Sequence, residues 1–362
     1  MKIYPFRATL PDLSKIEQST AFFNQVREGF PHLFSEGYFL PEADEAIYLY
    51  SISDSHGTHT GVIGLVPLTA WAERRILPHE HTITEKVNRQ EELLAWRQAA
   101  VKPVLLTYRA QASIQNWIWQ YQQDHEPVQT VQLNEETHRC WRVSDVRSQS
   151  VLALLLANID RAYVADGHHR LESTHQYYQQ HPTQPARVLC GLFGHQTLTV
   201  DSFHRAVRTQ LPLDRKSILQ RFEPYCYVSP LPAGRLPATH HELTCYAAGQ
   251  WYLLIWREEI LEKHARLVER LDTALLNRYL LHDALGIEDV RTSDDVRYLP
   301  AQGDTTALVE KIDSRENAMG FCLYPIDVQT MMAVADEGEV LPPKSTWFCP
   351  RLQNGILVQK VA

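Results

Sequence analysis

The feature that most constrains the fold of this chain is the segment V-A-D-G-H-H-R at residues 164–170, followed by L-E-S-T-H-Q-Y-Y at residues 171–178. Its first residues are apolar and β-prone, and Gly167 is a turn residue. The residues after the turn are helix formers with tyrosines at helical spacing. The pattern predicts a strand, a tight turn and the start of a helix.

The predicted turn places ionisable side chains at a helix N-terminus. Such a terminus carries backbone N–H groups without intrahelical partners and the positive end of the helix dipole, so it attracts anions. Asp166, His168, His169 and Arg170 surround that point. Their chemistry suits a phosphate group. The alternative is that these side chains only cap the helix or face water.

The composition narrows the class of protein. Hydrophobic residues make up 44% of the chain and charged residues 22%, which is typical of a packed globular protein. The 43 acidic residues outnumber the 35 basic ones, so the chain lacks the overall basic character of nucleic-acid-binding proteins, and nucleic acid is not an expected partner. The six cysteines include no C-x-x-C pair, which indicates reduced thiols.

The sequence gives no sign of membrane insertion or secretion. The longest apolar run, residues 151–157, is far shorter than the roughly 20 residues that a membrane span needs. Residues 1–7 do not contain the long apolar stretch of a signal peptide. We therefore expect a cytoplasmic protein with no membrane partner.

The length of 362 residues favours two domains over one. Four prolines between residues 224 and 237 predict connecting segments near residues 210–240. We therefore expect a phosphate-binding or nucleotide-binding core in residues 1–210 and a C-terminal α+β domain in residues 211–362.

Hydrophobic periodicity predicts a mixed set of helices and strands, and thus an α/β (mixed α+β) fold. Thr82 and Glu85 fit a capping box at the start of one helix. The expected helices cover residues 11–30, 83–100, 113–122, 150–159, 267–285 and 328–335. The expected strands cover residues 46–52, 60–66, 104–108, 128–133, 138–143, 162–165, 187–193 and 250–256.

Two further stretches concentrate reactive side chains. His79 and Glu80 precede the helix at 83–100, and Lys86 and Arg89 lie three residues apart on one face of it. The triplet H-E-H is not the H-E-x-x-H pattern of zinc sites, so no zinc is predicted there. Residues 344–346, K-S-T between prolines and aromatics, form a rigid loop that presents a cation and two hydroxyls; a purely structural loop is the alternative.

Four stretches in this order resemble the bacterial and archaeal family known as "domain of unknown function ten-fifteen". They are P-F-R at residues 5–7, H-E-x-T-x-x-x-K-x-x-R at 79–89, A-D-G-H-H-R at 165–170, and P-K-S-T-W-F-x-P at 343–350. The chain departs from the family in Asn88, where aspartate is common, and in D-S-F-H-R at 201–205, where x-P-T-H-R is expected.

The turn around Gly167 also resembles the G-H-H-R or G-x-H-R turn of the ParB and sulfiredoxin group, which includes free-serine kinases. That resemblance implies a ParB/sulfiredoxin-like core of mixed strands and helices, with the C-terminal α+β region closing the site. It further implies nucleotide chemistry, and we expect ATP or ADP as the nucleotide, Mg²⁺ as the metal, and a small hydroxyl compound such as free serine as the acceptor.

A phosphoryl-transfer site needs phosphate ligands, a base for the acceptor hydroxyl and usually Mg²⁺. In this interpretation Glu80 is the general base with His79 beside it, Asp166 holds the metal, and His168 takes part in catalysis. Gly167 lets the backbone approach the phosphates. The remaining candidate nucleotide ligands are His169, Arg170, Lys86, Arg89, His204, Arg205, Lys344, Ser345 and Thr346. A shared site also predicts Lys344 in one cleft with Asp166 and Glu80.

Two other functions use the same residues. A non-catalytic nucleotide-binding regulator would need the turn but not Glu80. A phosphohydrolase or nuclease-like enzyme would use the same histidines and aspartate with water as the acceptor.

Overall fold

The computed structural model describes residues 1–361 except for residues 56, 183–184, 212–213, 302–304 and 316–317. The chain divides into unit 1, Met1–Leu198 with Pro350–Ala362, and unit 2, Thr199–Cys349. Compared with the division expected from the sequence, residues 199–210 pack in unit 2 and the C-terminal segment returns to unit 1.

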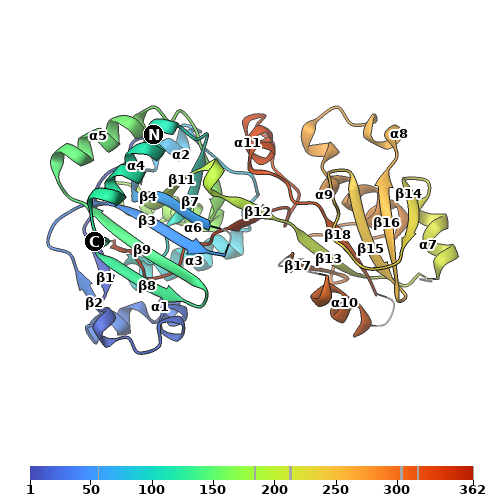
Figure 1. Ribbon diagram of the computed structural model, residues 1–362, viewed down its shortest axis with the longest axis horizontal. Helices are drawn as coiled ribbons and strands as arrows, with labels where there is room; N and C mark the ends of the chain where they lie inside the picture. The colour runs from blue at the N-terminus through green and yellow to red at the C-terminus, as the bar shows by residue number, and fades with distance from the viewer. Residues whose placement is uncertain (56, 183–184, 212–213, 302–304, 316–317, 362) are drawn as a thin grey trace. The chain divides into compact units, whose positions relative to one another are not determined.

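Unit 1 is built on an eight-stranded mixed sheet (Figure 1). The neighbouring pairs β10–β5 and β11–β7 are parallel, and the other neighbours are antiparallel. In sheet order the strands are β5 (Ile76–Leu77), β10 (Ala162–Asp166), β7 (Val104–Tyr108), β11 (Arg187–Gly194), β4 (Gly57–Pro67), β3 (Ile47–Asp54), β9 (Glu136–Val143) and β8 (Gln129–Leu133).

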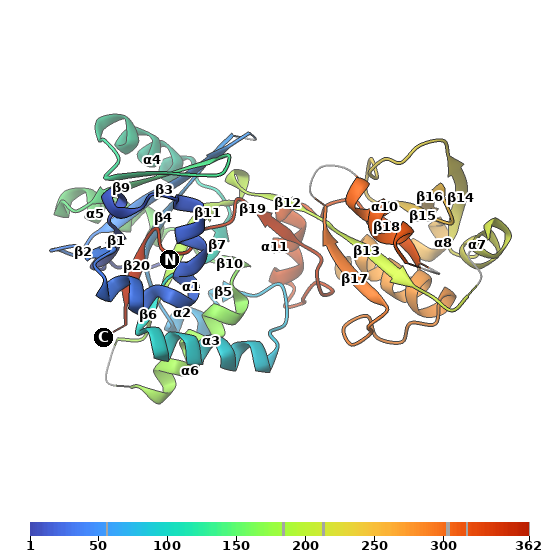
Figure 2. The ribbon, with the colours of Figure 1, turned by 90° about the horizontal axis from the view of Figure 1, so that it is seen from below.

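A second, four-stranded sheet joins the two ends of unit 1, because β20 pairs with β1. Its strands in order are β2 (Phe39–Pro41), β1 (Ala8–Pro11), β20 (Val358–Lys360) and β6 (Ala99–Ala100). The helices are α1 (Ser19–Ser35), α2 (Thr69–Ala72), α3 (Thr84–Arg97), α4 (Ala112–Asp124), α5 (Val146–Ala157) and α6 (His168–Gln180), with 3₁₀ turns at Leu13–Lys15 and His195–Thr197. Figure 2 shows α3 and α6 side by side.

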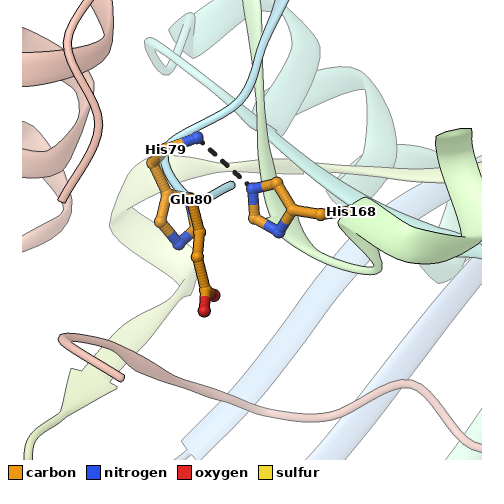
Figure 3. A group of neighbouring side chains, drawn as sticks. All are labelled: His79, Glu80 and His168. Carbon is orange, nitrogen blue, oxygen red and sulfur yellow. Dashed lines mark hydrogen bonds between the residues drawn. The ribbon is translucent and has the colours of Figure 1, made fainter. Parts of the chain in front are cut away.

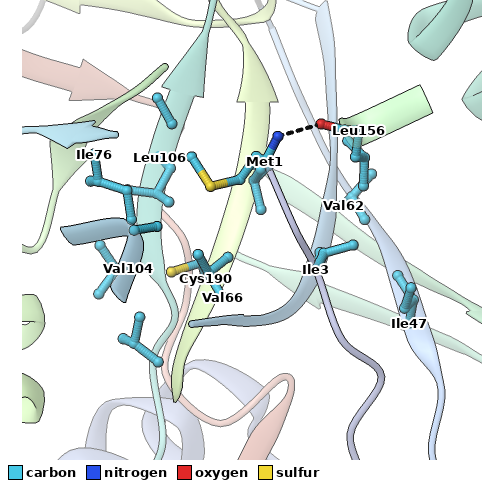
Figure 4. Close-up of a cluster of buried hydrophobic side chains, with 14 of the residues drawn as sticks. Met1, Ile3, Ile47, Val62, Val66, Ile76, Val104, Leu106, Leu156 and Cys190 are labelled. Carbon is cyan, nitrogen blue, oxygen red and sulfur yellow. Dashed lines mark hydrogen bonds between the residues drawn. The ribbon is translucent and has the colours of Figure 1, made fainter. Parts of the chain in front are cut away.

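The core of unit 1 consists of apolar side chains from the strands and from the helices that cover them (Figure 4). Val62, Leu106 and Leu156 in this core are fully buried. The amino group of Met1 donates a hydrogen bond to the carbonyl of Leu156 at 2.7 Å and so closes one side of the cluster. The hydrophobic runs of the sequence therefore supply the central strands, which are covered on both faces.

The hairpin expected at residues 46–52 and 60–66 is confirmed as β3 and β4, which pair antiparallel from Tyr48–Ile63 to Asp54–Gly57. The predicted capping box at the start of α3 is wrong, because the N-cap is Ile83 and not Thr82. The backbone N–H of Ile83 donates to Nε2 of His169 at 3.1 Å. A tertiary contact thus takes the place of the local cap.

Unit 2 contains a six-stranded antiparallel sheet and a two-stranded one. The larger sheet has the order β14 (Cys226–Leu231), β16 (Gln250–Trp256), β15 (Glu242–Ala247), β18 (Ala318–Leu323), β13 (Phe203–Arg208) and β17 (Val296–Pro300). The smaller sheet pairs β12 (Thr199–Asp201) with β19 (Trp347–Cys349). The α-helices are α7 (Arg215–Phe222), α8 (Glu258–Leu261), α9 (Asp272–Leu275), α10 (Thr306–Asp313) and α11 (Val328–Asp336).

Two expectations for unit 2 are wrong. The proline-rich stretch is not only a connector, because it contains β14. This strand lies at the edge of the sheet, where a proline such as Pro230 is tolerated because it lacks the backbone N–H that a central strand needs for its hydrogen bonds. The single helix expected at residues 267–285 is instead a 3₁₀ turn at Leu267–Arg270, the short α9, and a π-helical segment at Leu276–Ala284. The Asp272 side chain accepts hydrogen bonds from Trp256 Nε1 and from the His241 backbone, and these bonds fix the break.

The expected mixed α/β fold is confirmed. All six cysteines are free thiols, and only Cys349 is not buried. Of the helices in the described part of the chain, none combines the length and the hydropathy required to cross a membrane.

Candidate functional site

The strand, turn and helix expected around Gly167 are confirmed. Strand β10 ends at Asp166, and α6 begins at His168. Between them Gly167 has φ +106°, in the left-handed region that side chains with a Cβ rarely adopt. A Cβ at this position would lie 2.6 Å from an Nη atom of Arg170. The glycine is therefore required both by the backbone turn and by the close approach of a guanidinium.

Asp166 is the centre of an ion network. Its carboxylate accepts a hydrogen bond from Arg170 at 2.9 Å and another from Arg351 at 3.2 Å, and the ammonium of Lys102 lies 4.0 Å away. Burial by itself raises the pKa of Asp166, but Arg170, Lys102 and Arg351 outweigh it and hold the pKa well below its usual range. The carboxylate stays ionised and orients the three cations.

This network does not fit the expected role of Asp166 as a magnesium ligand. Both carboxylate oxygens already contact cationic groups, Oδ2 contacting Arg170 and Oδ1 contacting Arg351. A divalent cation at either oxygen would have to displace a guanidinium and would be repelled by the remaining charges. Asp166 instead positions the guanidinium of Arg170.

His79 and His168 form a buried pair at the start of α6 (Figure 3). Their rings pack edge to face with centroids 4.5 Å apart. The Nδ1–H of His79 donates to the carbonyl of Val164 at 2.6 Å, and the backbone N–H of His79 donates to Nε2 of His168 at 3.3 Å. These bonds assign complementary tautomers: in His79 the basic nitrogen is Nε2, and in His168 the proton is on Nδ1.

Glu80 completes this group. One ligand atom each from His79, Glu80 and His168 lies within 4.8 Å of the other two, and Glu80 is only partly buried. A carboxylate, a basic imidazole nitrogen and an imidazole N–H are thus held together beside the N-terminus of α6. This combination can accept a proton from a substrate hydroxyl and can donate a hydrogen bond to an anionic group.

One segment distant in sequence, the one before α3, is fastened to α6 by the first two residues of that helix. His168 accepts the N–H of His79, and His169 accepts the N–H of Ile83. Each histidine therefore uses Nε2 to hold the backbone of the segment before α3. In His168 the Nδ1–H can then serve as a donor toward a ligand.

Burial makes the histidine pair sensitive to acid. It lowers the pKa of His79 to about 4 and that of His168 well below its usual range, so both rings are neutral at pH 7. Below pH ~6.5 the unfolded chain takes up protons that the folded chain does not, and unit 1 should lose stability as the pH falls from about 6.5 toward 4. For His79 alone the loss is on the order of 3 kcal/mol.

Urea unfolding at pH 7 and pH 5 tests this expectation. The variant His79→Asn keeps an N–H donor at the position of Nδ1 but does not titrate, so its urea midpoint should vary less with pH than that of the wild type. His32→Asn, a change at a histidine whose side chain is 76% exposed, is the control and should keep the wild-type dependence. Equal pH dependence of wild type and His79→Asn would contradict the assignment.

The other expected ligands in unit 1 lie on the surface. Lys86 and Arg89 are exposed on α3. They take no part in the ion network of Asp166 described above. Their assignment as phosphate ligands stays a prediction.

Unit 2 brings together the two motifs that lie in it. Arg205 on β13 is fully buried, donates to the carbonyl of Phe203 and to that of Lys344 at 3.0 Å, and stacks on the Tyr298 ring. Its side chain therefore holds the K-S-T loop. His204 is also buried, and neither of its ring nitrogens has a hydrogen-bond partner among the described residues.

Within the K-S-T loop the three side chains differ. Lys344 has φ +56°, is exposed, and places its ammonium 5.3 Å from the centroid of the Phe203 ring. Ser345 is buried and donates to the carbonyl of Pro342 at 2.6 Å, while Thr346 is partly buried. Lys344 belongs to unit 2, whereas Asp166 and Glu80 belong to unit 1. A cleft that all three share stays a prediction.

The sequence analysis missed the partners of Asp166. Lys102 precedes β7, and Arg351 lies 185 positions after Asp166. Neither belongs to the motifs quoted above. The one available signal was that Arg351 directly follows the P-K-S-T-W-F-x-P stretch.

Comparison with known proteins gives a family match and remote structural neighbours. A family model described as "Protein of unknown function (DUF1015)" matches residues 6–274. A search of the curated proteins returns no match.

Three solved structures illustrate the structural neighbours. A free serine kinase variant in complex with ADP is 12% identical with a TM-score of 0.41, covering 83% of this chain and 92% of that chain. SbnI with a C-terminal truncation, from Staphylococcus aureus, is 13% identical with a TM-score of 0.42, covering 81% and 85%. A conserved hypothetical protein from Pyrococcus furiosus is 13% identical with a TM-score of 0.39, covering 82% and 95%.

Proposed function

The chain belongs to the DUF1015 family of proteins of unknown function, and from that premise we propose that it is a nucleotide-dependent phosphotransferase acting on a small hydroxyl metabolite. ATP or ADP is the proposed donor, and free serine is the first acceptor to be tested. The observation that carries the proposal is the convergence of His79, Glu80 and His168 at the start of α6. It joins acid–base groups to an anion-binding helix N-terminus.

The helix start supplies the phosphate-binding part of the proposal. Helix α6 has 13 residues, and its dipole and first-turn N–H groups favour an anion at Gly167. Arg170 lies in the first turn, where the Asp166 carboxylate fixes its guanidinium. A guanidinium held in this way can bind a phosphate in two-point contact without first being ordered.

The acid–base group supplies the reactive part. Glu80 takes the proton of the acceptor hydroxyl as the acceptor oxygen forms its bond to the transferred phosphorus. The bond from that phosphorus to the nucleotide oxygen breaks, and the nucleotide keeps the electron pair. The His168 Nδ1–H can donate to a phosphate oxygen, while the basic nitrogen of His79 can accept a second hydrogen bond from the acceptor.

Removing the cation in the first turn tests the binding half of the proposal. Arg170→Ala is expected to weaken nucleotide binding by about 1.5–3 kcal/mol, because a charged hydrogen bond is lost. Isothermal titration with ADP and ATP, with and without Mg²⁺, measures it. Arg147→Ala on the exposed face of α5 is the matched control. Unchanged affinity of Arg170→Ala would place the nucleotide elsewhere.

A single-turnover assay tests the transfer half. Wild-type protein is mixed with labelled ATP or with ADP carrying a labelled β-phosphate, and with serine as the acceptor. Transfer to serine or to another small alcohol supports the proposal. Release of inorganic phosphate to water would favour a phosphohydrolase, and nucleotide binding without any transfer would favour a nucleotide-binding regulator.

A further inference from the structure

Unit 1 contains a cavity of about 220 Å³ whose lining is strongly cationic. It lies between α3 and α6 and reaches the beginnings of β7 and β11. None of the described residues that line it is an aspartate or a glutamate. The cationic lining residues are Arg27, Arg97, Lys102, Arg170, Arg187 and Arg351.

Three of these six cations, Arg170, Lys102 and Arg351, contact the carboxylate of Asp166. Within the described part of the chain, Arg27, Arg97 and Arg187 are not paired with any carboxylate; instead Arg97 donates to the Arg27 carbonyl and Arg187 stacks on the Tyr4 ring. The chain as a whole has a net charge of -8, so this local excess of positive charge is not a reflection of composition.

The excess charge is partly buried and therefore costly. Burial, with Arg170 and Arg351 nearby, lowers the pKa of Lys102 to about 7. The Nε–H groups of Arg97 and Arg170 are buried without a hydrogen-bond partner among the described residues. Buried donors of this kind normally have an acceptor, so these two N–H groups add to the cost of the local positive charge.

The cavity adjoins the acid–base group without including His79, Glu80 or His168 in its lining. His168 and Arg170 are two residues apart on α6, which places them about 160° apart around the helix axis. His168 packs on His79, whereas Arg170 lines the cavity together with Ser173 and Thr174. Arg170 is therefore common to both: Asp166 holds its guanidinium at the start of α6, where the acid–base group lies, and the same side chain lines the cavity.

We propose that this cavity is a binding site for the phosphate groups of a small ligand that carries at least two negative charges. The proposal does not rest on phosphoryl transfer by Glu80. The phosphates can belong to the nucleotide itself or to a second phosphorylated compound. Both sources share the chemistry that the cavity recognises, and competition separates them.

Pyrophosphate is the probe, because it carries the charge without a base or a sugar. Isothermal titration of the full chain should show saturable binding. The variants Arg97→Gln, Lys102→Met and Arg187→Gln should each weaken it about tenfold or more. Arg147→Gln on α5 is the matched control and should bind as the wild type does.

Thermal melting without ligand separates a ligand site from a structural one. Removing one cation from an over-positive cavity should leave the melting temperature unchanged or raise it, and pyrophosphate should raise the melting temperature of the wild type. Lower melting temperatures for all three variants, or wild-type affinity for pyrophosphate in them, would overturn the proposal. So would the absence of saturable binding to the wild type.

Competition with ADP identifies the source of the phosphates. Displacement of pyrophosphate by ADP means that the cavity holds the phosphates of the nucleotide, and simultaneous binding means a second ligand; each result supports the site. Even if Glu80→Gln no longer phosphorylates serine, its binding of pyrophosphate and the competition with ADP should be the same as in the wild type. Failure of the transfer reaction and failure of the cavity are therefore distinguishable.

Discussion

Gly167→Val is expected to reduce nucleotide affinity by about 100-fold or more. The residue has φ +106°, a conformation that is strained for a β-branched side chain. The new side chain would also collide with the Arg170 guanidinium, which lies 2.6 Å from the position of a Cβ. Displacing Arg170 breaks its bond to Asp166 and removes a cation from the phosphate-binding turn. Equilibrium titration with ADP at a temperature where the variant is folded measures the effect.

Gly57→Val is the control for backbone strain. Gly57 has φ +139°, and an added Cβ would meet nothing within 4 Å. It should lower stability by roughly 1–3 kcal/mol, as strain at a positive φ does, while leaving ADP affinity intact. Gly167→Ala, which adds only the Cβ, should fall between wild type and valine. Wild-type affinity in Gly167→Val would mean that phosphates do not bind at this turn.

Glu80→Gln is expected to lower kcat about 10²–10⁴-fold while nucleotide affinity changes little. The substitution keeps the size and polarity of the side chain and removes its ability to accept a proton. A general base acts in the chemical step, whereas phosphate ligands such as Arg170 act in the ground state as well. Single-turnover transfer to serine and equilibrium binding of ADP, measured on the same preparation, separate the two effects.

Glu85→Gln is the matched control. Glu85 is an exposed carboxylate in the first turn of α3 and undergoes the same chemical change. It should transfer at the wild-type rate. If Glu80→Gln also transfers at that rate, then Glu80 is a structural carboxylate and the base has to be sought elsewhere, with His79 as the next candidate.

The elements that the sequence predicted well are those with a local cause. The hairpin β3–β4 follows from alternating β-prone residues on both sides of a polar turn. The turn at Gly167 follows from one residue that tolerates positive φ between an apolar strand and helix formers. Local propensity failed where tertiary contacts took over, as in the N-cap of α3 and in the helix broken at Asp272.

In the candidate site, too, some features were predicted from the local sequence and others depend on tertiary contacts. The sequence by itself predicted His79, Glu80 and the A-D-G-H-H-R turn as the groups able to do chemistry, since residue type and helix position carry that information. Only the tertiary structure decided that Asp166 binds guanidinium groups rather than suiting a metal, and that each histidine of the turn holds a distant backbone N–H.

The physical reason is that charge and hydrogen-bond partners are set by packing. Lys102 and Arg351 reach Asp166 from segments far from it in sequence, and the cationic cavity gathers side chains from α1, α3, α6 and four other segments. A one-dimensional pattern records which residues are ionisable. Which of them are buried together, and with what surplus of charge, is decided when the chain folds.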